Sequence, residues 1–398
     1  MLRQPLAPIP PRPRVAAINN FLVAHRRSLA LLSCLALGVL GVVFLIVSTR
    51  GVLAENTAID FHAYWRAALA IRTGDSPYLA GQLTGPIGPM GLDLYRYPPA
   101  LAVLLVPLSL LGSGPAYLVW SLASGLAFWL AIMLALRAGG TGLSWRSSAA
   151  GLVGLILFFP VFDSLWKGNL EGFEALLLAV ALVGGVRAGA ASTALAWLKV
   201  APVLVIPAAL LAGGRRAWLG FGAVCVAVAL TIPLAPTAWA DLGRVLLNEA
   251  GGDPVLPQNF APAVVLGGLV PGYPGLIFDL RLLVFASVAG LIVSSLWLAR
   301  RPAGWPLALT AAIYASLLAP GTLWFHYTAV LLVPVAYAWP RADGLRRTEL
   351  LAALGLIAFG PANRPLFLVG LVVLGLLLAR LLTPEGRPKA GIDEPVLA

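Results

Sequence analysis

The chain has 398 residues, of which 60% are hydrophobic and only 11% are charged, and its mean hydropathy is +0.91. Soluble domains carry about a quarter charged residues, so a soluble core could not cover this much apolar surface. The composition predicts an all-α, polytopic integral membrane protein. The net charge of +11 does not indicate a nucleic-acid partner, because most basic residues stand at the ends of apolar runs, where they orient membrane helices.

The two ends of the chain are predicted to be tails. Residues 1–28 are rich in proline and arginine and are predicted to form a disordered basic tail in the cytoplasm. The apolar run 29–48 follows Arg26 and Arg27 and lacks a clear cleavage site, so it is interpreted as a membrane anchor. Residues 29–382 are predicted to form a single transmembrane domain, and 383–398 a second cytoplasmic tail. Cys34 and Cys225 lie within apolar runs, which argues against a disulfide framework.

Roughly 10 to 12 membrane helices are expected from the apolar runs. These runs lie at 29–48, 115–136, 149–166, 170–187, 216–236, 277–299, 304–320, 326–340, 348–361 and 365–382. Two further runs, 98–112 and 194–214, contain internal prolines, which interrupt helices.

The distribution of arginine favours one of two topologies. If 98–112 only dips into the membrane and 189–213 forms two half-helices, the later arginine clusters fall in the cytoplasm with the N-terminus. If both runs cross fully, Arg137, Arg146 and Arg187 fall outside, against the charge rule. We therefore expect the first topology, with outer loops at 49–114 and 237–276. Juxtamembrane helices are expected in the first of these loops.

The sequence lacks the motifs of soluble nucleotide, zinc or serine chemistry, and it shows no internal repeat. A transporter built from two homologous halves therefore has little support. Neither a metal nor a cofactor is expected.

A polar cluster follows the first apolar run, in the segment AIDFHAYWRAALA at 58–70. In a helix, Asp60 and Tyr64 share one face, and His62 shares another with Arg66. One interpretation is an amphipathic helix at the membrane surface. The other makes Asp60 a general base that takes the proton of a sugar hydroxyl.

Lys199 and His326 are polar residues inside apolar segments. A lysine within a membrane segment is costly, so Lys199 either reaches an interface or binds a lipid phosphate. His326 follows a Pro-Gly turn and is either structural or a phosphate-binding or proton-handling group. Further substrate-binding candidates are His62, Tyr64 and Arg66 in the polar cluster and, more weakly, Arg96, Lys167, Asn169, Gln258 and Asn259.

Over residues 28–340 the chain resembles the polyprenol-phosphate mannosyltransferase family of the GT-C membrane glycosyltransferases. That family includes phosphatidylinositol-mannoside mannosyltransferases and related arabinofuranosyltransferases. The resemblance rests on a succession of segments: Asp60, Tyr64, Ala70, Gly74, Pro77 and Tyr78; YRYPPALAVLLVPLSLL at 95–111; the Gly-Asn pair at 168–169; LKVAPVLVIPAALLAGGRRAW at 198–218; and LAPGTLWFHYTAVLLVP at 318–334.

The resemblance implies an inverting transfer of mannose from a polyprenyl-phosphate donor to a lipid or glycan acceptor. It implies that Asp60 is the catalytic base, that His326 lies near the donor phosphate and that Lys199 contacts it. It also implies a bacterial plasma-membrane location, with the site facing the periplasm or exterior. Arabinofuranosyl transfer, a lipid-linked sugar flippase and a structural subunit with a decayed site remain alternatives. The family's late NQS-like and GQxN patterns appear here only as PQNF at 257–260 and KGNLE at 167–171, which leaves sugar and acceptor open.

Overall fold

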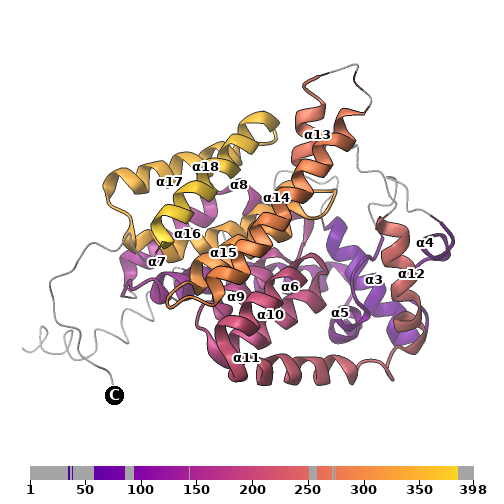
Figure 1. Ribbon diagram of the computed structural model, residues 1–398. Helices are drawn as coiled ribbons and strands as arrows, with labels where there is room; N and C mark the ends of the chain where they lie inside the picture. The colour runs from indigo at the N-terminus through magenta and orange to yellow at the C-terminus, as the bar shows by residue number, and fades with distance from the viewer. Residues whose placement is uncertain are drawn as a thin grey trace, which may run out of the picture.

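The computed structural model describes residues 58–85, 94–142, 144–250, 258–270 and 275–383, with the isolated positions 35, 38 and 273 (Figure 1). The predicted first span and both predicted tails lie outside the described residues, apart from positions 35, 38 and 383. All regular structure within the described part of the chain is helical, as the sequence predicts.

The first half of the described chain contains ten helical elements. In chain order they are α3 (Ile59–Thr73), α4 (Ala80–Thr84), α5 (Pro99–Leu104), the 3₁₀ helix η1 (Val106–Leu110), α6 (Ser113–Ala138), α7 (Trp145–Leu157), α8 (Phe159–Lys167), α9 (Glu171–Ala181), α10 (Gly185–Leu198) and η2 (Ala201–Leu204).

The second half contains ten more elements. They are α11 (Val205–Ala229), α12 (Pro236–Ala250), α13 (Pro262–Gly267), α14 (Leu276–Ala299), α15 (Trp305–Leu318), η3 (Phe325–Leu331), α16 (Leu332–Ala338), η4 (Trp339–Arg341), α17 (Gly344–Ala358) and α18 (Arg364–Leu382).

Four of the described helical stretches are long and apolar enough to cross a membrane: α6, η2 with α11, α14 and α18. The pair α7 and α8 would make a fifth, although it is bent by 71°. Many apolar side chains of α14 are exposed, among them Leu283, Phe285 and Val293. Such a surface is stable in lipid and not in water, so the protein is an integral membrane protein. The other predicted spans within the described residues correspond to shorter or broken helices.

The two proline-containing runs are interrupted, as in the topology favoured by the charge distribution. Run 98–112 forms only the short helices α5 and η1, which are together too short to span a bilayer. Run 194–214 is broken between α10 and η2, at Lys199 and Val200. A second break follows at Gly214, where φ is +54° and α11 is kinked. Neither run therefore forms one continuous helix over its whole length.

The described helices enclose two large buried apolar regions and a small third one around Ala208, Ala299 and Ala308. The larger one lies among α6, α9, α15, α16 and α18, with Phe128, Leu309 and Phe367 among its fully buried side chains. The second large region lies beneath the first predicted outer loop and includes the aromatic rings of Phe61 and Tyr64. In Figure 1, α3, α4, α5 and α12 gather at one end of the molecule, and α17 and α18 lie at the other. The polar residues described next lie where α3 meets α8 and α9.

Candidate active site

The first turn of α3 is fixed by a contact with the end of α8. Ala58, which precedes the helix, adopts a left-handed conformation with φ of +63°. Its backbone N–H donates a hydrogen bond of 2.9 Å to the carbonyl oxygen of Trp166. This contact places Asp60, two residues later, beside the link between α8 and α9.

That link passes very close to α3 at Gly168. Gly168 has φ of +71°, and a Cβ at this position would lie 2.6 Å from the Cβ of Phe61. Only glycine has neither a Cβ nor a strong penalty in this conformation. The Trp120 Nε1–H on α6 donates to the Gly168 carbonyl oxygen at 2.7 Å. The link is therefore held from two sides, and the next residue, Asn169, is aimed into the protein.

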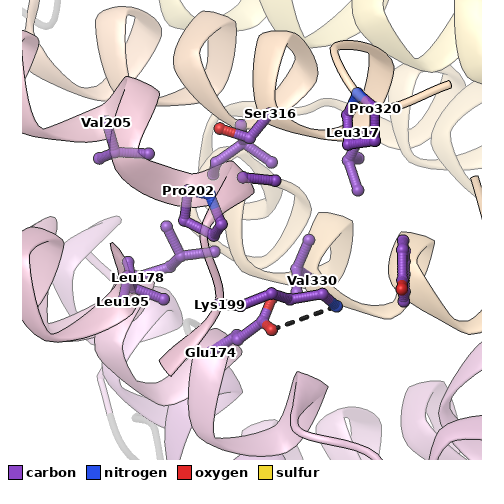
Figure 2. Close-up of a pocket in the computed structure, with 13 residues that line it drawn as sticks. Glu174, Leu178, Leu195, Lys199, Pro202, Val205, Ser316, Leu317, Pro320 and Val330 are labelled. Carbon is purple, nitrogen blue, oxygen red and sulfur yellow. Dashed lines mark ion pairs between the residues drawn. The ribbon is translucent and has the colours of Figure 1, made fainter. Parts of the chain in front are cut away.

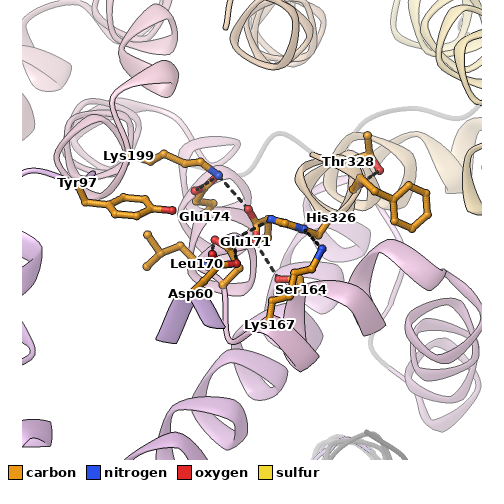
Figure 3. Close-up of polar contacts among 12 residues, drawn as sticks. Asp60, Tyr97, Ser164, Lys167, Leu170, Glu171, Glu174, Lys199, His326 and Thr328 are labelled. Atoms are coloured by element: carbon orange, nitrogen blue, oxygen red, sulfur yellow. Dashed lines mark hydrogen bonds and ion pairs between the residues drawn. The ribbon is translucent and has the colours of Figure 1, made fainter. Parts of the chain in front are cut away.

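Asn169 joins Asp60 to His326 in one buried network (Figure 3 shows Asp60 and His326). Its Nδ2 lies 2.8 Å from Asp60 Oδ2 and 2.7 Å from His326 Nε2. Its Oδ1 accepts from the Tyr64 hydroxyl at 3.1 Å and from the Leu170 backbone N–H at 2.7 Å. Residues from α3, the α8–α9 link and η3 thus meet at a single carboxamide.

His326 also contacts an ion pair within α8. Its Nδ1 lies 3.0 Å from Asp163 Oδ2, and Lys167 Nζ lies 2.9 Å from the same oxygen. His326 is buried, whereas 28% of the Lys167 side chain is exposed. The Lys167 side chain as a whole is therefore more exposed than that of His326.

Lys199 is held by two carboxylates of α9. Its Nζ lies 2.9 Å from Glu171 Oε1 and 3.3 Å from Glu174 Oε1. The same ammonium group stands 3.4 Å above the centre of the Tyr327 ring, a favourable cation–π geometry. Because both carboxylates are buried, the lysine charge is compensated within the protein. Figure 3 shows Lys199 and His326 approaching Glu171 from different sides.

Burial alters the acidity of the side chains in α3. The pKa of the Asp60 carboxyl is raised, because desolvation penalises the charged form more than His326, Lys167 and the hydrogen bond with Asn169 favour it, and Glu171 penalises it further. Burial also raises the pKa of the Tyr64 hydroxyl well above its ordinary value. Tyr64 therefore keeps its proton and can donate it to Asn169.

Asn259 anchors the segment that leads to His326. Its Nδ2 donates to the Gly321 carbonyl oxygen at 3.0 Å, and its Oδ1 accepts from the Leu323 backbone N–H at 2.9 Å. The neighbouring Phe260 N–H donates to the Leu323 carbonyl oxygen at 2.8 Å. Asn259 thus touches the loop before η3 and not the residues around Asn169.

A small pocket lies directly beside Lys199 (Figure 2). Its volume is about 40 Å³, and its wall combines apolar residues of α9, α10, α11, α15 and η3 with Lys199 and Glu174. That volume holds only a few water molecules, so this pocket is too small for a sugar ring in this conformation.

The structure brings several of the predicted site residues together and leaves others apart. Those that meet around Asn169 or next to it are Asp60, Tyr64, Lys167, Asn169, Lys199 and His326. Arg66 and Gln258 are exposed, His62 is half-buried beside the Phe61 ring, and Arg96 is half-buried. Their predicted contacts with substrate remain predictions.

Three acidic residues of this network were not predicted from the sequence: Asp163, Glu171 and Glu174. The sequence does contain a pattern that indicates Asp163: it stands four positions before Lys167 within an apolar segment, the spacing of an ion pair on one helix face. Glu171 and Glu174 likewise share one face of α9 and are carboxylates in an otherwise apolar helix. Within the described residues, no group of three or more histidine, cysteine, aspartate or glutamate side chains is placed to hold a metal ion.

Comparison with known proteins identifies the family. The family model for glycosyltransferase family 87 matches residues 95–323. This range includes Lys167, Asn169 and Lys199, whereas Asp60 lies 35 positions before it and His326 three positions after it. Neither a curated protein nor a solved structure shows a significant match to the chain. Because the matched range covers more than half of the sequence, the chain belongs to glycosyltransferase family 87 and is a membrane glycosyltransferase.

Proposed function

We propose that this protein transfers mannose from a polyprenyl-phosphate donor to a hydroxyl group of a lipid or glycan acceptor, with Asp60 as the general base. The observation that supports this role best is the position of Asp60. It keeps part of its surface exposed while Asn169 fixes one of its carboxylate oxygens from the buried side. The other oxygen, Oδ1, has no bonded partner among the described residues and is available to an acceptor hydroxyl.

The reaction is a single displacement at the anomeric carbon. The acceptor oxygen forms a bond to this carbon while the bond from the carbon to the phosphate oxygen breaks. The electron pair of the broken bond leaves with polyprenyl phosphate, and the acceptor proton moves to Asp60. Attack from the face opposite the phosphate inverts the configuration.

The departing phosphate gains negative charge, and a nearby cation stabilises it. We assign this role first to Lys167, because its side chain is partly exposed and its ammonium group has one carboxylate partner. Lys199, the phosphate contact implied by the family resemblance, already has two carboxylate partners. We therefore assign Lys199 to the support of α9, from which Glu171 faces the network.

The lipid nature of the donor is consistent with two features of the molecule. Apolar helices surround the polar network, and the pocket beside Lys199 has a largely apolar wall. The sequence also lacks a glycine-rich phosphate-binding loop that a soluble nucleotide sugar would favour. With the arginine-rich N-terminal segment in the cytoplasm, Asp60 lies on the outer face of a bacterial plasma membrane.

A transfer assay in nanodiscs tests the proposal. Purified wild-type protein is supplied with radiolabelled polyprenyl phosphate mannose and a membrane-lipid extract, alongside Asp60→Asn. Loss of a general base lowers the rate by roughly 100- to 10,000-fold. Asp75→Asn is the matched control, because Asp75 lies after α3 and bonds to Thr73 on the exposed surface.

The outcomes separate the parts of the proposal. Label transfer by wild type and by Asp75→Asn, but not by Asp60→Asn, supports both the reaction and the base. Full activity of Asp60→Asn shows that another group is the base. If only a polyprenyl-phosphate arabinofuranose donor is used, the sugar assignment is wrong and the reaction class stands. If neither lipid donor is used, the donor assignment is wrong.

A further inference from the structure

The carboxamide of Asn169 has a defined orientation. The Leu170 backbone N–H lies 2.7 Å from the Asn169 side chain, and a backbone N–H can only donate. The atom facing it must therefore be the amide oxygen. The Tyr64 hydroxyl, which burial keeps protonated, donates to the same oxygen at 3.1 Å. These two contacts turn the amide nitrogen toward Asp60 and His326.

This orientation determines which partner donates to His326. The Asn169 nitrogen donates two hydrogens, one to Asp60 Oδ2 at 2.8 Å and one to His326 Nε2 at 2.7 Å. His326 Nε2 is thus an acceptor without a proton. On the other side of the ring, Nδ1 lies 3.0 Å from a carboxylate oxygen of Asp163 and 3.4 Å from the Lys167 ammonium. Because Nε2 accepts from Asn169, a neutral ring carries its proton on Nδ1, which then donates to the nearer Asp163 oxygen. His326 is therefore the neutral tautomer with its proton on Nδ1.

Asn169 has no hydrogen-bonding capacity left for a ligand. An amide side chain offers two donors and two acceptor lone pairs, and the protein uses all four. These bonds occupy the Asn169 side chain with protein groups, and its predicted contact with substrate remains a prediction. The contacts of Asn169 connect Asp60 and His326, which come from segments far apart in the chain.

We propose that Asn169 is a positioning residue that keeps Asp60 ready to accept a proton and holds His326 neutral. The proposal rests on the proposed role of Asp60 as the base and explains how that base is prepared. Asn169 engages only Oδ2 of Asp60, so the second oxygen stays directed to the acceptor. It also disfavours a proton on His326 Nε2, because such a proton would face the Asn169 N–H, donor against donor.

The groups that face Asp60 come from every neighbouring element. They are Tyr64 on α3, Tyr97, Lys167 on α8, Glu171 on α9 and His326 on η3. A positive charge on His326 would favour the charged form of Asp60 most, Glu171 disfavours it, and Lys167 favours it. Replacing the Asn169 amide by a carboxylate adds a negative group at hydrogen-bonding distance from Asp60, so the proton on the pair is held more tightly.

Asn169→Asp tests the proposal because it preserves shape and exchanges donors for acceptors. In a plot of transfer rate against pH, the acidic limb should shift to higher pH by about one unit or more. At pH values on this limb, the activity of the variant should be about tenfold lower than that of the wild type. Asn363→Asp is the matched control. Asn363 caps α18 by accepting a hydrogen bond from the Leu366 N–H, and aspartate is an equally good cap. The acidic limb of the pH–rate profile should therefore be unchanged in Asn363→Asp. An unmoved limb in Asn169→Asp overturns the proposal.

A measurement on the wild-type protein covers the case in which Asn169→Asp does not fold. Nitrogen-15 NMR of histidine-labelled protein near neutral pH reports which ring nitrogen carries the proton. The chain has three histidines, and His326→Gln identifies the signal of His326. A proton on Nδ1 alone supports the proposal, and a proton on Nε2 overturns it. This readout needs no sugar donor, so it separates a failure of the positioning role from a failure of the proposed transfer reaction.

Discussion

Asn169 Nδ2 lies 2.8 Å from Asp60 Oδ2, although 109 positions separate the two residues in the chain. The contact depends on the close approach of Gly168 to Phe61 and on the backbone hydrogen bond from Ala58 to Trp166. Asp60, in the first turn of α3, is thereby oriented by the link between α8 and α9. The predictions below test the individual parts of this arrangement.

The rate of transfer should depend on the ionisation of Asp60. The base must be unprotonated, so activity is low in acid and rises with pH through the Asp60 pKa. Because burial raises this pKa, the rising limb should lie above the range of an exposed aspartate. Initial rates of wild-type transfer measured against pH check this. A limb in the ordinary aspartate range would show that the carboxylate is better solvated than the structure indicates.

The same raised pKa predicts the effect of Asp60→Asn on stability. A raised folded-state pKa means that the folded protein binds this proton more tightly than the unfolded chain. The stability that this proton contributes to the folded protein is complete at pH values below the pKa of Asp60 in the unfolded chain. It is lost as pH rises through the pKa of Asp60 in the folded protein. At neutral pH, Asp60→Asn should therefore melt at or above the wild-type temperature while losing transfer. A clear drop in melting temperature would mean that the charged carboxylate stabilises the fold.

Removing the Lys199 ammonium should destabilise the protein. Lys199→Met leaves Glu171 and Glu174 buried without their cation, and breaking such a pair costs about 3–5 kcal/mol. Combining Lys199→Met with Glu171→Gln and Glu174→Gln removes the unpaired charges and should restore much of this loss. Thermal unfolding in detergent checks both proteins. Arg244→Met is the control, because 71% of the Arg244 side chain is exposed and its ion pair is weak.

Gly168→Ala should impair both stability and transfer. The new Cβ meets Phe61 at 2.6 Å and must displace the start of α3, where Asp60 lies. Gly74→Ala separates this contact from backbone strain, since Gly74 has φ of +87° and open space around its Cβ position. Strain alone costs about 1 kcal/mol in either variant. Melting temperature and transfer rate should therefore fall further for Gly168→Ala, and equal losses would mean that the contact is unimportant.

Asn259→Ala should reduce transfer by loosening the segment before His326. The Leu323 N–H and the Gly321 carbonyl oxygen lose their partner, which costs about 1–3 kcal/mol. Asn248→Ala is the comparison, because it removes one hydrogen bond to the Gln82 carbonyl oxygen on the outer loop. Transfer assays on both proteins, normalised to folded protein, check the prediction. If the two variants lose activity equally, Asn259 has no special connection to His326.

The sequence predicts the helical fold and several members of the network because polar residues are conspicuous in an apolar chain. Asp60, Lys199 and His326 stand out for this reason, and the structure places all three around the α8–α9 link. The number of spans is harder to predict, because hydropathy does not register the break at Lys199 or the bend between α7 and α8. The pairing of Lys199 with Glu171 and Glu174 depends on how α9 and α10 pack, which sequence spacing does not give.

The ion pairs next to the candidate site differ from the histidine contacts in their separation along the chain. Lys167 and Asp163 are one helical turn apart, and Lys199 lies 28 positions from Glu171. His326 lies 157 positions from Asn169. Both lysines can therefore find their carboxylates during membrane insertion, before the ribosome has made the segment with His326, so no isolated charge has to enter the bilayer. The order of these residues in the chain thus allows both lysines to be paired before His326 is synthesised, whereas the network around Asn169 requires His326.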